Sequence, residues 1–147
     1  MNKLLKVNKD ERGSFTELWR KDWRIPFTPA EISQSMISIS KPNVIRAWHK
    51  HERRQDDYLV VISGIVKIVY IETWPFNTRF VEYVVDGKRP ELVYIPGNCW
   101  HGTQALTDTT TIYFVTQLYD YENPDELRRP PDYDFGWGAF EWGKRST

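Results

Sequence analysis

The chain has 147 residues, and its 20 basic and 20 acidic side chains give a formal net charge of zero. This length suits one domain with a substantial core, and the balanced charge argues against nucleic acid or an anionic membrane surface as the main partner. No apolar run reaches the roughly 18 residues that a membrane span needs, and residues 1–13 lack the apolar core of a secretory signal. The single cysteine, Cys99, cannot form an internal disulfide, so we expect a cytoplasmic protein.

Strand patterns dominate the chain from residue 34 onward. Residues 34–40 (QSMISIS) alternate polar and apolar side chains, the period of a half-buried strand. Residues 57–63 and 65–72 predict two strands that are separated by a turn at Gly64. Residues 78–85 alternate again, residues 86–90 (DGKRP) predict a turn, and residues 91–95 and 109–119 are rich in β-branched and aromatic side chains. Strands at this spacing predict a sandwich or a barrel.

Two C-terminal segments depart from the strand pattern. Residues 124–129 predict a short helix, which Pro130 and Pro131 would end. Residues 133–147 (YDFGWGAFEWGKRST) are rich in glycine and aromatic side chains. We expect an irregular tail that packs its rings on another surface, such as a second subunit.

The three histidines of the chain fall at two sites next to predicted strands. His49 and His51 stand at i and i+2 in VIRAWHKHERRQDDYLVVISG (residues 44–64), and His101 follows a Pro–Gly turn in VYIPGNCWHGTQAL. Side chains at i and i+2 of a strand point to the same face. In a barrel, all three imidazoles can therefore enter one cavity. The alternative is that the pair is satisfied by local hydrogen bonds and has no further role.

These two stretches resemble the two motifs of the cupins, which are small jelly-roll barrels. Cupins carry H-x-H and an acid before a glycine, and later P-x-G-x-x-H. Asp57 stands for the acid here, and the glycine follows the proline directly in IPGNCWHG. The resemblance implies an all-β protein, a single-domain cupin jelly-roll barrel over residues 1–147.

Further stretches resemble the dTDP-4-dehydrorhamnose 3,5-epimerases within the cupins. DERGSFTELWR (residues 10–20) is similar to their D-x-R-G-x-F-x-E opening, and QSMIS is similar to their Q-x-x-x-S strand. RAWHKH stands where the family has R-G-L-H, and PGNCWHG stands where it has a Pro–Gly turn followed by His-Gly. YFVTQLYDYENPDE resembles its Y-K-x-T-x-x-Y segment when one gap is allowed. The order holds over roughly residues 10–142.

The resemblance implies proton abstraction next to the ketone of a nucleotide-linked 4-keto-6-deoxysugar. Such chemistry needs a base, an acid on the opposite face and donors for the enolate oxygen. By the resemblance His49 is the base and Tyr113 is the acid. It also implies no cofactor and no metal, a homodimer, and Arg12, Phe15 and Glu17 reaching the site from the partner subunit. The substrate-binding residues would be Arg46, His51, His101, Arg12, Phe15, Glu17, Gln34 and Asp57.

The chain departs from the family at three points. Asp57 and Phe114 stand where the family has lysines. The S-x-K-D segment, whose aspartate pairs with the base in the family, has no counterpart in the sequence. Another acid, Asp56 or Asp57, would then have to orient the base.

Three other functions stay open from the sequence. RAWHKH also resembles the R-G-x-H-A-H-K motif of the dTDP-4-keto-6-deoxyhexose 3,4-ketoisomerases, in which two neighbouring histidines act. A metal-binding cupin could use His49, His51, Asp57 and His101 as ligands of a divalent transition metal. A sugar-nucleotide-binding protein without catalysis is the third alternative.

Overall fold

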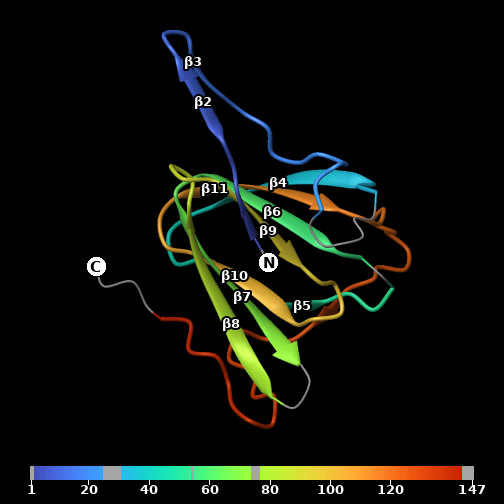
Figure 1. Ribbon diagram of the computed structural model, residues 1–147. Helices are drawn as coiled ribbons and strands as arrows, with labels where there is room; N and C mark the ends of the chain where they lie inside the picture. Colours follow the sequence, from blue (N-terminus) through green and yellow to red (C-terminus); the bar gives the residue numbers. More distant parts are fainter. Residues whose placement is uncertain (1, 25–30, 54, 74–76, 144–147) are drawn as a thin grey trace.

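The computed structural model describes residues 2–24, 31–53, 55–73 and 77–143 (Figure 1). Within these ranges the chain is all-β, which confirms the predicted jelly-roll fold. One five-stranded sheet, which we call sheet one, has the order β1-β9-β6-β11-β4, and the other, sheet two, has the order β12-β5-β10-β7-β8. The strands of sheet one are β1 (Asn2–Leu4), β9 (Glu91–Ile95), β6 (Asp57–Ser63), β11 (Thr109–Val115) and β4 (Gln34–Ser40). Those of sheet two are β12 (Leu127–Arg128), β5 (Ile45–Lys50), β10 (His101–Ala105), β7 (Ile65–Thr73) and β8 (Thr78–Asp86).

A small hairpin follows β1. It pairs β2 (Val7–Asp10) with β3 (Gly13–Thr16) and projects away from the two sheets (Figure 1). All the strand pairs of the two sheets are antiparallel, so each strand can present alternate side chains to the interior and to the outside. The described ranges contain no helix of the length and apolarity that a membrane crossing needs.

Apolar side chains on both faces of β6 and β7 are buried, which explains their nearly continuous hydrophobic runs. Leu59 and Ile68 belong to the cluster between the sheets. Tyr58 and Val60 point to the other face of sheet one, where Trp19 and other side chains of the N-terminal segment cover them. Because both faces of the sheet are covered, the apolar residues in these strands follow one another without a regular alternation of polar residues.

The aromatic tail packs on its own chain, on the outer face of sheet two. Trp48 of β5 is fully buried there, and its ring centroid lies 5.0 Å from that of Trp142. Both indole N–H groups donate to the carbonyl oxygen of Pro131 at 3.1 Å. The described part of the tail, up to Gly143, thus covers this face of its own chain. From the sequence we expected the tail to pack on another surface, such as a second subunit. Residues 144–147 lie outside the described residues.

The predicted strands at residues 34–40, 57–63 and 91–95 match the observed bounds. The predicted helix at residues 124–129 is wrong, because β12 pairs Leu127 with Lys50 and Arg128 with His49 as an edge strand of sheet two. The Asp125 carboxylate holds this segment to the loop after β5, since it accepts the backbone N–H groups of Glu52 and Arg53 at 2.8 Å each. These long-range bonds outweigh a weak local preference. β11 ends at Val115, short of the predicted residue 119.

Candidate active site

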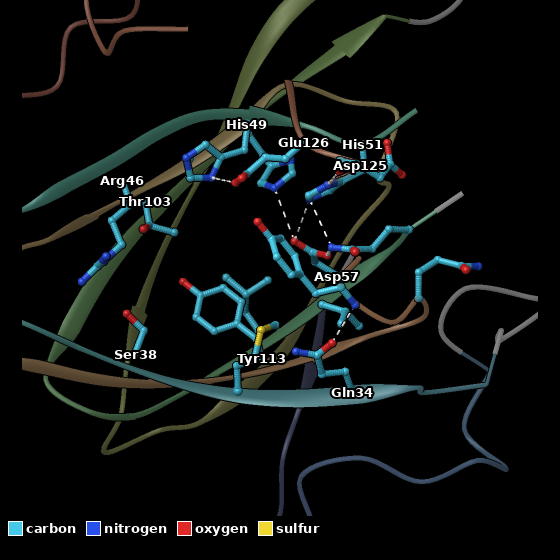
Figure 2. Close-up of a pocket in the computed structure, with 18 of the residues that line it drawn as sticks. Gln34, Ser38, Arg46, His49, His51, Asp57, Thr103, Tyr113, Asp125 and Glu126 are labelled. Atoms are coloured by element: carbon cyan, nitrogen blue, oxygen red, sulfur yellow. Dashed lines mark hydrogen bonds and ion pairs between the residues drawn. The ribbon is translucent and has the colours of Figure 1, made fainter. Parts of the chain in front are cut away.

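A pocket of about 760 Å³ lies between the two sheets, and side chains from both sheets point into it (Figure 2). β4 contributes Gln34 and Ser38, β5 contributes Arg46 and His49, and β11 contributes Tyr113. The volume suits a ligand of small-molecule size, and polar groups converge on it from several strands.

His49 lies on β5 with its ring at the pocket, and a glutamate stands behind it. Its Nδ1 atom lies 3.7 Å from Oε1 of Glu126, whose side chain is only 17% exposed. Burial lowers the pKa of His49, and the Glu126 carboxylate offsets this only in part. The imidazole is therefore neutral at neutral pH. A carboxylate beside Nδ1 favours the tautomer that carries its proton there, which leaves the lone pair on Nε2.

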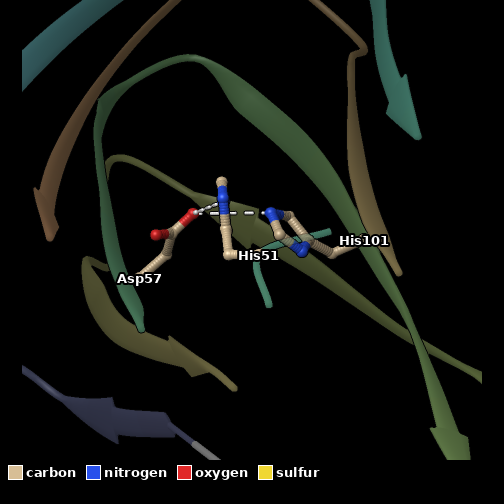
Figure 3. A group of neighbouring side chains, drawn as sticks. All are labelled: His51, Asp57 and His101. Atoms are coloured by element: carbon tan, nitrogen blue, oxygen red, sulfur yellow. Dashed lines mark ion pairs between the residues drawn. The ribbon is translucent and has the colours of Figure 1, made fainter. Parts of the chain in front are cut away.

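His51, Asp57 and His101 form a buried cluster beside His49 (Figures 2 and 3). Oδ2 of Asp57 lies 3.6 Å from Nε2 of His51 and 3.4 Å from Nε2 of His101. Burial by itself would raise the pKa of Asp57, but hydrogen bonds with His101 and His51 outweigh it and keep that pKa well below its usual range. Burial would lower the pKa of His51, and Asp57 reverses this, so the pKa is raised.

The two motifs meet because the strands that carry them pair. His101 lies directly opposite His49 in the β10–β5 register, and a bulge follows between His101 and Gly102. A Cβ atom at Gly102 would lie 2.4 Å from the Cβ of Ala47, so only glycine allows this close approach of the two strands. The N–H of His51 donates to the carbonyl oxygen of Gly97 at 2.7 Å, which ties the Pro–Gly turn to the H-x-H segment.

Neither acid that the sequence suggested pairs with His49. Asp56 accepts the hydroxyl of Tyr94 at 3.0 Å and the N–H of Gly97 at 2.9 Å, which is a structural role. Asp57 faces His51 and His101. The carboxylate at His49 comes from Glu126 instead. This corrects the sequence-based expectation.

Tyr113 enters the pocket from sheet one, opposite the sheet that carries His49 (Figure 2). Burial raises the pKa of its hydroxyl, and a hydrogen bond with Thr103 lowers it by less. The hydroxyl is thus protonated at neutral pH and can donate.

Arg46 also lines the pocket, and its Nε donates to the hydroxyl of Ser40 at 3.1 Å. The Gln34 side-chain oxygen accepts the N–H of Tyr119 at 2.9 Å.

The remaining predicted residues lie away from this pocket within one chain. Arg12 and Phe15 belong to the projecting hairpin, where Arg12 pairs with Asp10 and Phe15 is 69% exposed. Glu17 pairs with Arg20 at 3.1 Å on the segment that follows. None of the three is among the residues that line the pocket.

Comparisons with known proteins agree with this architecture. Residues 3–144 match the model of the dTDP-4-dehydrorhamnose 3,5-epimerase family. The chain belongs to this family. It is 37% identical to the probable low-salt glycan biosynthesis epimerase Agl13 of Haloferax volcanii, over 94% of this chain and 89% of that protein. It is 34% identical to the spore coat polysaccharide biosynthesis protein SpsL of Bacillus subtilis, over 95% of this chain and 94% of that protein.

A solved structure supports the fold of this epimerase-family chain. The dTDP-4-dehydrorhamnose 3,5-epimerase of Sulfolobus tokodaii superposes with a TM-score of 0.78 at 24% identity, over 95% of this chain and 78% of that one. At this identity the likeness shows the shared jelly-roll fold.

Sequence reasoning missed two residues at the site of this epimerase-family chain, Asp125 and Glu126. They sit in the acidic stretch ENPDE, whose only local signal was a weak helix prediction. Asp125 accepts a hydrogen bond from Nδ1 of His51 through its carbonyl oxygen at 2.5 Å, and Glu126 faces His49. The pairing of β12 with β5 places Asp125 and Glu126 beside the histidines of β5 and of the loop after it. No pattern in the sequence predicts that pairing.

Proposed function

We propose that this chain is a sugar-nucleotide epimerase, acting on a nucleotide-linked 4-keto-6-deoxysugar. Carbons 3 and 5 of such a sugar flank the carbonyl, and their hydrogens are acidic because the resulting anion delocalises onto the oxygen. Removing a proton from one face and returning one to the other inverts the carbon. Family membership supports this reaction class, and the named relatives suggest a role in making cell-surface polysaccharide.

One observation carries the proposal: His49 and Tyr113 enter a single pocket from opposite sheets. In this proposal the neutral His49 takes the proton through Nε2, and the Tyr113 hydroxyl donates one from the other face of the sugar ring. Glu126 acts as a positioning residue, since it stands beside Nδ1 and stabilises the imidazolium that forms.

The other polar groups of the pocket would bind the substrate. A guanidinium such as that of Arg46 offers planar paired donors for a diphosphate or for the developing enolate. Gln34 lines the same wall of the pocket as Tyr113, since β4 pairs with β11. His51, Asp57 and His101 would form a polar surface beneath the sugar.

A homodimer is part of the proposal, and two exposed regions support it. Ile37 and Ile39 are 62% and 71% exposed on β4, the edge strand of sheet one. Such apolar edges are normally covered. The projecting hairpin would bring Arg12 and Phe15, with Glu17 after it, to the pocket of the second copy.

The contacts of His51 favour an epimerase over a ketoisomerase. A ketoisomerase that uses both histidines of the H-x-H motif needs a free nitrogen on each. Nδ1 of His51 is engaged with the carbonyl oxygen of Asp125, and Nε2 faces Asp57 and the Gln55 amide. Only His49 presents an unengaged ring nitrogen to the pocket in this arrangement.

The test is incubation of the protein with a dTDP-4-keto-6-deoxyhexose in D₂O, followed by NMR. We expect deuterium at carbon 3, carbon 5 or both, and a loss of exchange by about 10²-fold or more in His49→Ala. Migration of the ketone to carbon 3 would indicate the ketoisomerase instead. Absence of label with the wild-type protein would leave a non-catalytic binding protein, and wild-type exchange in His49→Ala would refute the base assignment.

A further inference from the structure

The Glu126 carboxylate divides its two oxygens between two partners. Oε1 lies 3.7 Å from Nδ1 of His49, whereas Oε2 accepts hydrogen bonds from Nε and Nη2 of Arg128 at 3.1 and 2.8 Å. We propose that Arg128 is a positioning residue for His49: it holds Oε2 of Glu126 so that Oε1 stays beside Nδ1 of the base. This inference rests on the proposed function, in which His49 takes the proton from the sugar.

The strand pairing places Arg128 next to the base. β12 pairs with β5, and Arg128 lies directly opposite His49 in that register. The bonds continue one residue further, since the N–H of Trp48 donates to the carbonyl oxygen of Arg129 at 2.7 Å and the N–H of Arg129 donates to that of Trp48 at 3.1 Å. Glu126 and Arg128 are two residues apart, a spacing that puts side chains on the same face of an extended segment. Both side chains line the pocket together with His49.

The contact between Glu126 and His49 is too long to fix the carboxylate by itself. A charge-assisted N–H···O bond is about 2.7–2.9 Å long, whereas the distance from Oε1 to Nδ1 is 3.7 Å. The terminal torsion of a glutamate is broad, so its carboxylate rotates readily unless a partner holds it. A guanidinium is planar and its donors have fixed directions. Two of these donors on Oε2 therefore set the orientation of the carboxylate and leave Oε1 for the imidazole.

The position of Oε1 decides which ring nitrogen of His49 carries the proton. A carboxylate beside Nδ1 favours the tautomer with the proton on Nδ1, and that tautomer leaves the lone pair of Nε2 for the proton of the sugar. If Glu126 turns away, the second tautomer, in which Nε2 carries the proton, becomes populated. A ring in that tautomer cannot take a proton through Nε2. The loss of Arg128 therefore reduces the fraction of the protein that is ready to react.

The charge of Arg128 acts in the opposite direction from its positioning role. Burial lowers the pKa of His49; among the charged neighbours of the ring, Glu126 raises that pKa, and His101, Arg128 and His51 lower it. Removal of the positive charge alone would therefore make His49 a stronger base. Positioning through Glu126 predicts instead a slower reaction when Arg128 is replaced, so the direction of the change in rate separates the two effects.

The first experiment reads the tautomer of His49 and needs no substrate. The chain has three histidines, so ¹⁵N-histidine labelling with long-range ¹H–¹⁵N NMR resolves each ring, and the His49 signals are those absent from His49→Asn. We expect the proton on Nδ1 in the wild-type protein, both tautomers in Arg128→Gln, and a smaller admixture in Arg128→Lys, which keeps the charge but loses the planar pair of donors. The Arg128 side chain is 72% exposed, and exposed salt bridges contribute little to folding, so these variants should stay folded. A His49 ring that keeps its proton on Nδ1 in folded Arg128→Gln would overturn the proposal.

The second experiment measures kcat and KM with a dTDP-4-keto-6-deoxyhexose. We expect kcat to fall by about tenfold in Arg128→Gln, with KM nearly unchanged, and to fall no further when Arg128→Gln is added to Glu126→Gln, because the two residues act through one contact. Arg129→Gln is the matched control: Arg129 lies over the rings of Trp100 and Tyr133, is not among the residues that line the pocket, and should keep the wild-type kcat. Losses that multiply in the double variant would mean that Arg128 acts directly on the substrate, which contradicts the proposal. If the wild-type protein turns over no substrate, the proposed function fails, while the NMR spectra still decide whether Arg128 sets the tautomer of His49.

Discussion

The Nδ1 atom of His49 lies 3.7 Å from Oε1 of Glu126, although the two residues come from distant parts of the chain. The β12 strand pairs with β5 and places the glutamate behind the ring. Arg128 contacts the same carboxylate at 2.8 Å, which helps to hold the Glu126 side chain in place. In the proposed mechanism, Glu126 therefore takes the orienting role that the sequence had left to Asp56 or Asp57.

Glu126→Gln tests that role. The amide keeps the size of the side chain but removes the charge that stabilises the imidazolium. Opposite charges about 4 Å apart attract each other by about 1 kcal/mol in water and about 4 kcal/mol near a protein surface, so kcat for epimerisation should fall by about tenfold to a hundredfold, with KM nearly unchanged. Steady-state kinetics measure both constants. Glu122→Gln, an exposed carboxylate on the same segment, is the control. A fall in kcat as large in Glu122→Gln would mean that the segment, and not the carboxylate at His49, matters.

Tyr113→Phe should separate the two halves of the reaction. His49 can still remove a proton, so exchange of the substrate hydrogen with D₂O should continue at a rate near that of the wild type. Inversion should fall by about 10²–10⁴-fold, because no acid stands on the opposite face. NMR in D₂O reads exchange and inversion in one sample. Tyr121→Phe, whose side chain is 86% exposed, should change neither. Full inversion in Tyr113→Phe would rule out Tyr113 as the acid.

The aromatic tail should contribute strongly to stability through Trp142. This side chain is 8% exposed and packs on Trp48, so Trp142→Ala should lower the free energy of unfolding by about 3 kcal/mol. Trp137 in the same tail is 45% exposed, and Trp137→Ala should cost about 1 kcal/mol. Urea denaturation followed by circular dichroism compares the two. Equal losses of unfolding free energy in the two variants would show that the burial of a tryptophan in the tail does not determine how much it stabilises the protein.

The proposed dimer should depend on the exposed apolar side chains of β4. Ile39→Glu introduces a charge into a surface that a second copy would cover, so the protein should become monomeric in light scattering after gel filtration. Val84→Glu is a matched control, because Val84 is 57% exposed on β8 of the other sheet and should leave the dimer intact. A dimeric Ile39→Glu protein would place the interface elsewhere.

The strands were predictable wherever burial imposed a local pattern. Residues 58–61 are apolar throughout because both faces of β6 are covered there. Residues 34–40 alternate, but in β4 the apolar Ile37 and Ile39 are exposed, whereas Ser38 and Ser40 are partly buried. Residues 124–129 were misread as a helix because their conformation depends on Asp125 bonds to Glu52 and Arg53. A pattern within six residues contains no information about such partners.

The amino-acid sequence alone determined the all-β fold, the family and the two segments that supply the histidines, because strand periodicity and motif spacing are properties of neighbouring residues. Tertiary structure decided which carboxylate meets which imidazole: Glu126 faces His49, whereas Asp57 faces His51 and His101. It also decided that the aromatic tail covers its own sheet two. These contacts depend on strand register and on the paths of loops between distant residues, where a shift of one position would point each side chain to the opposite face.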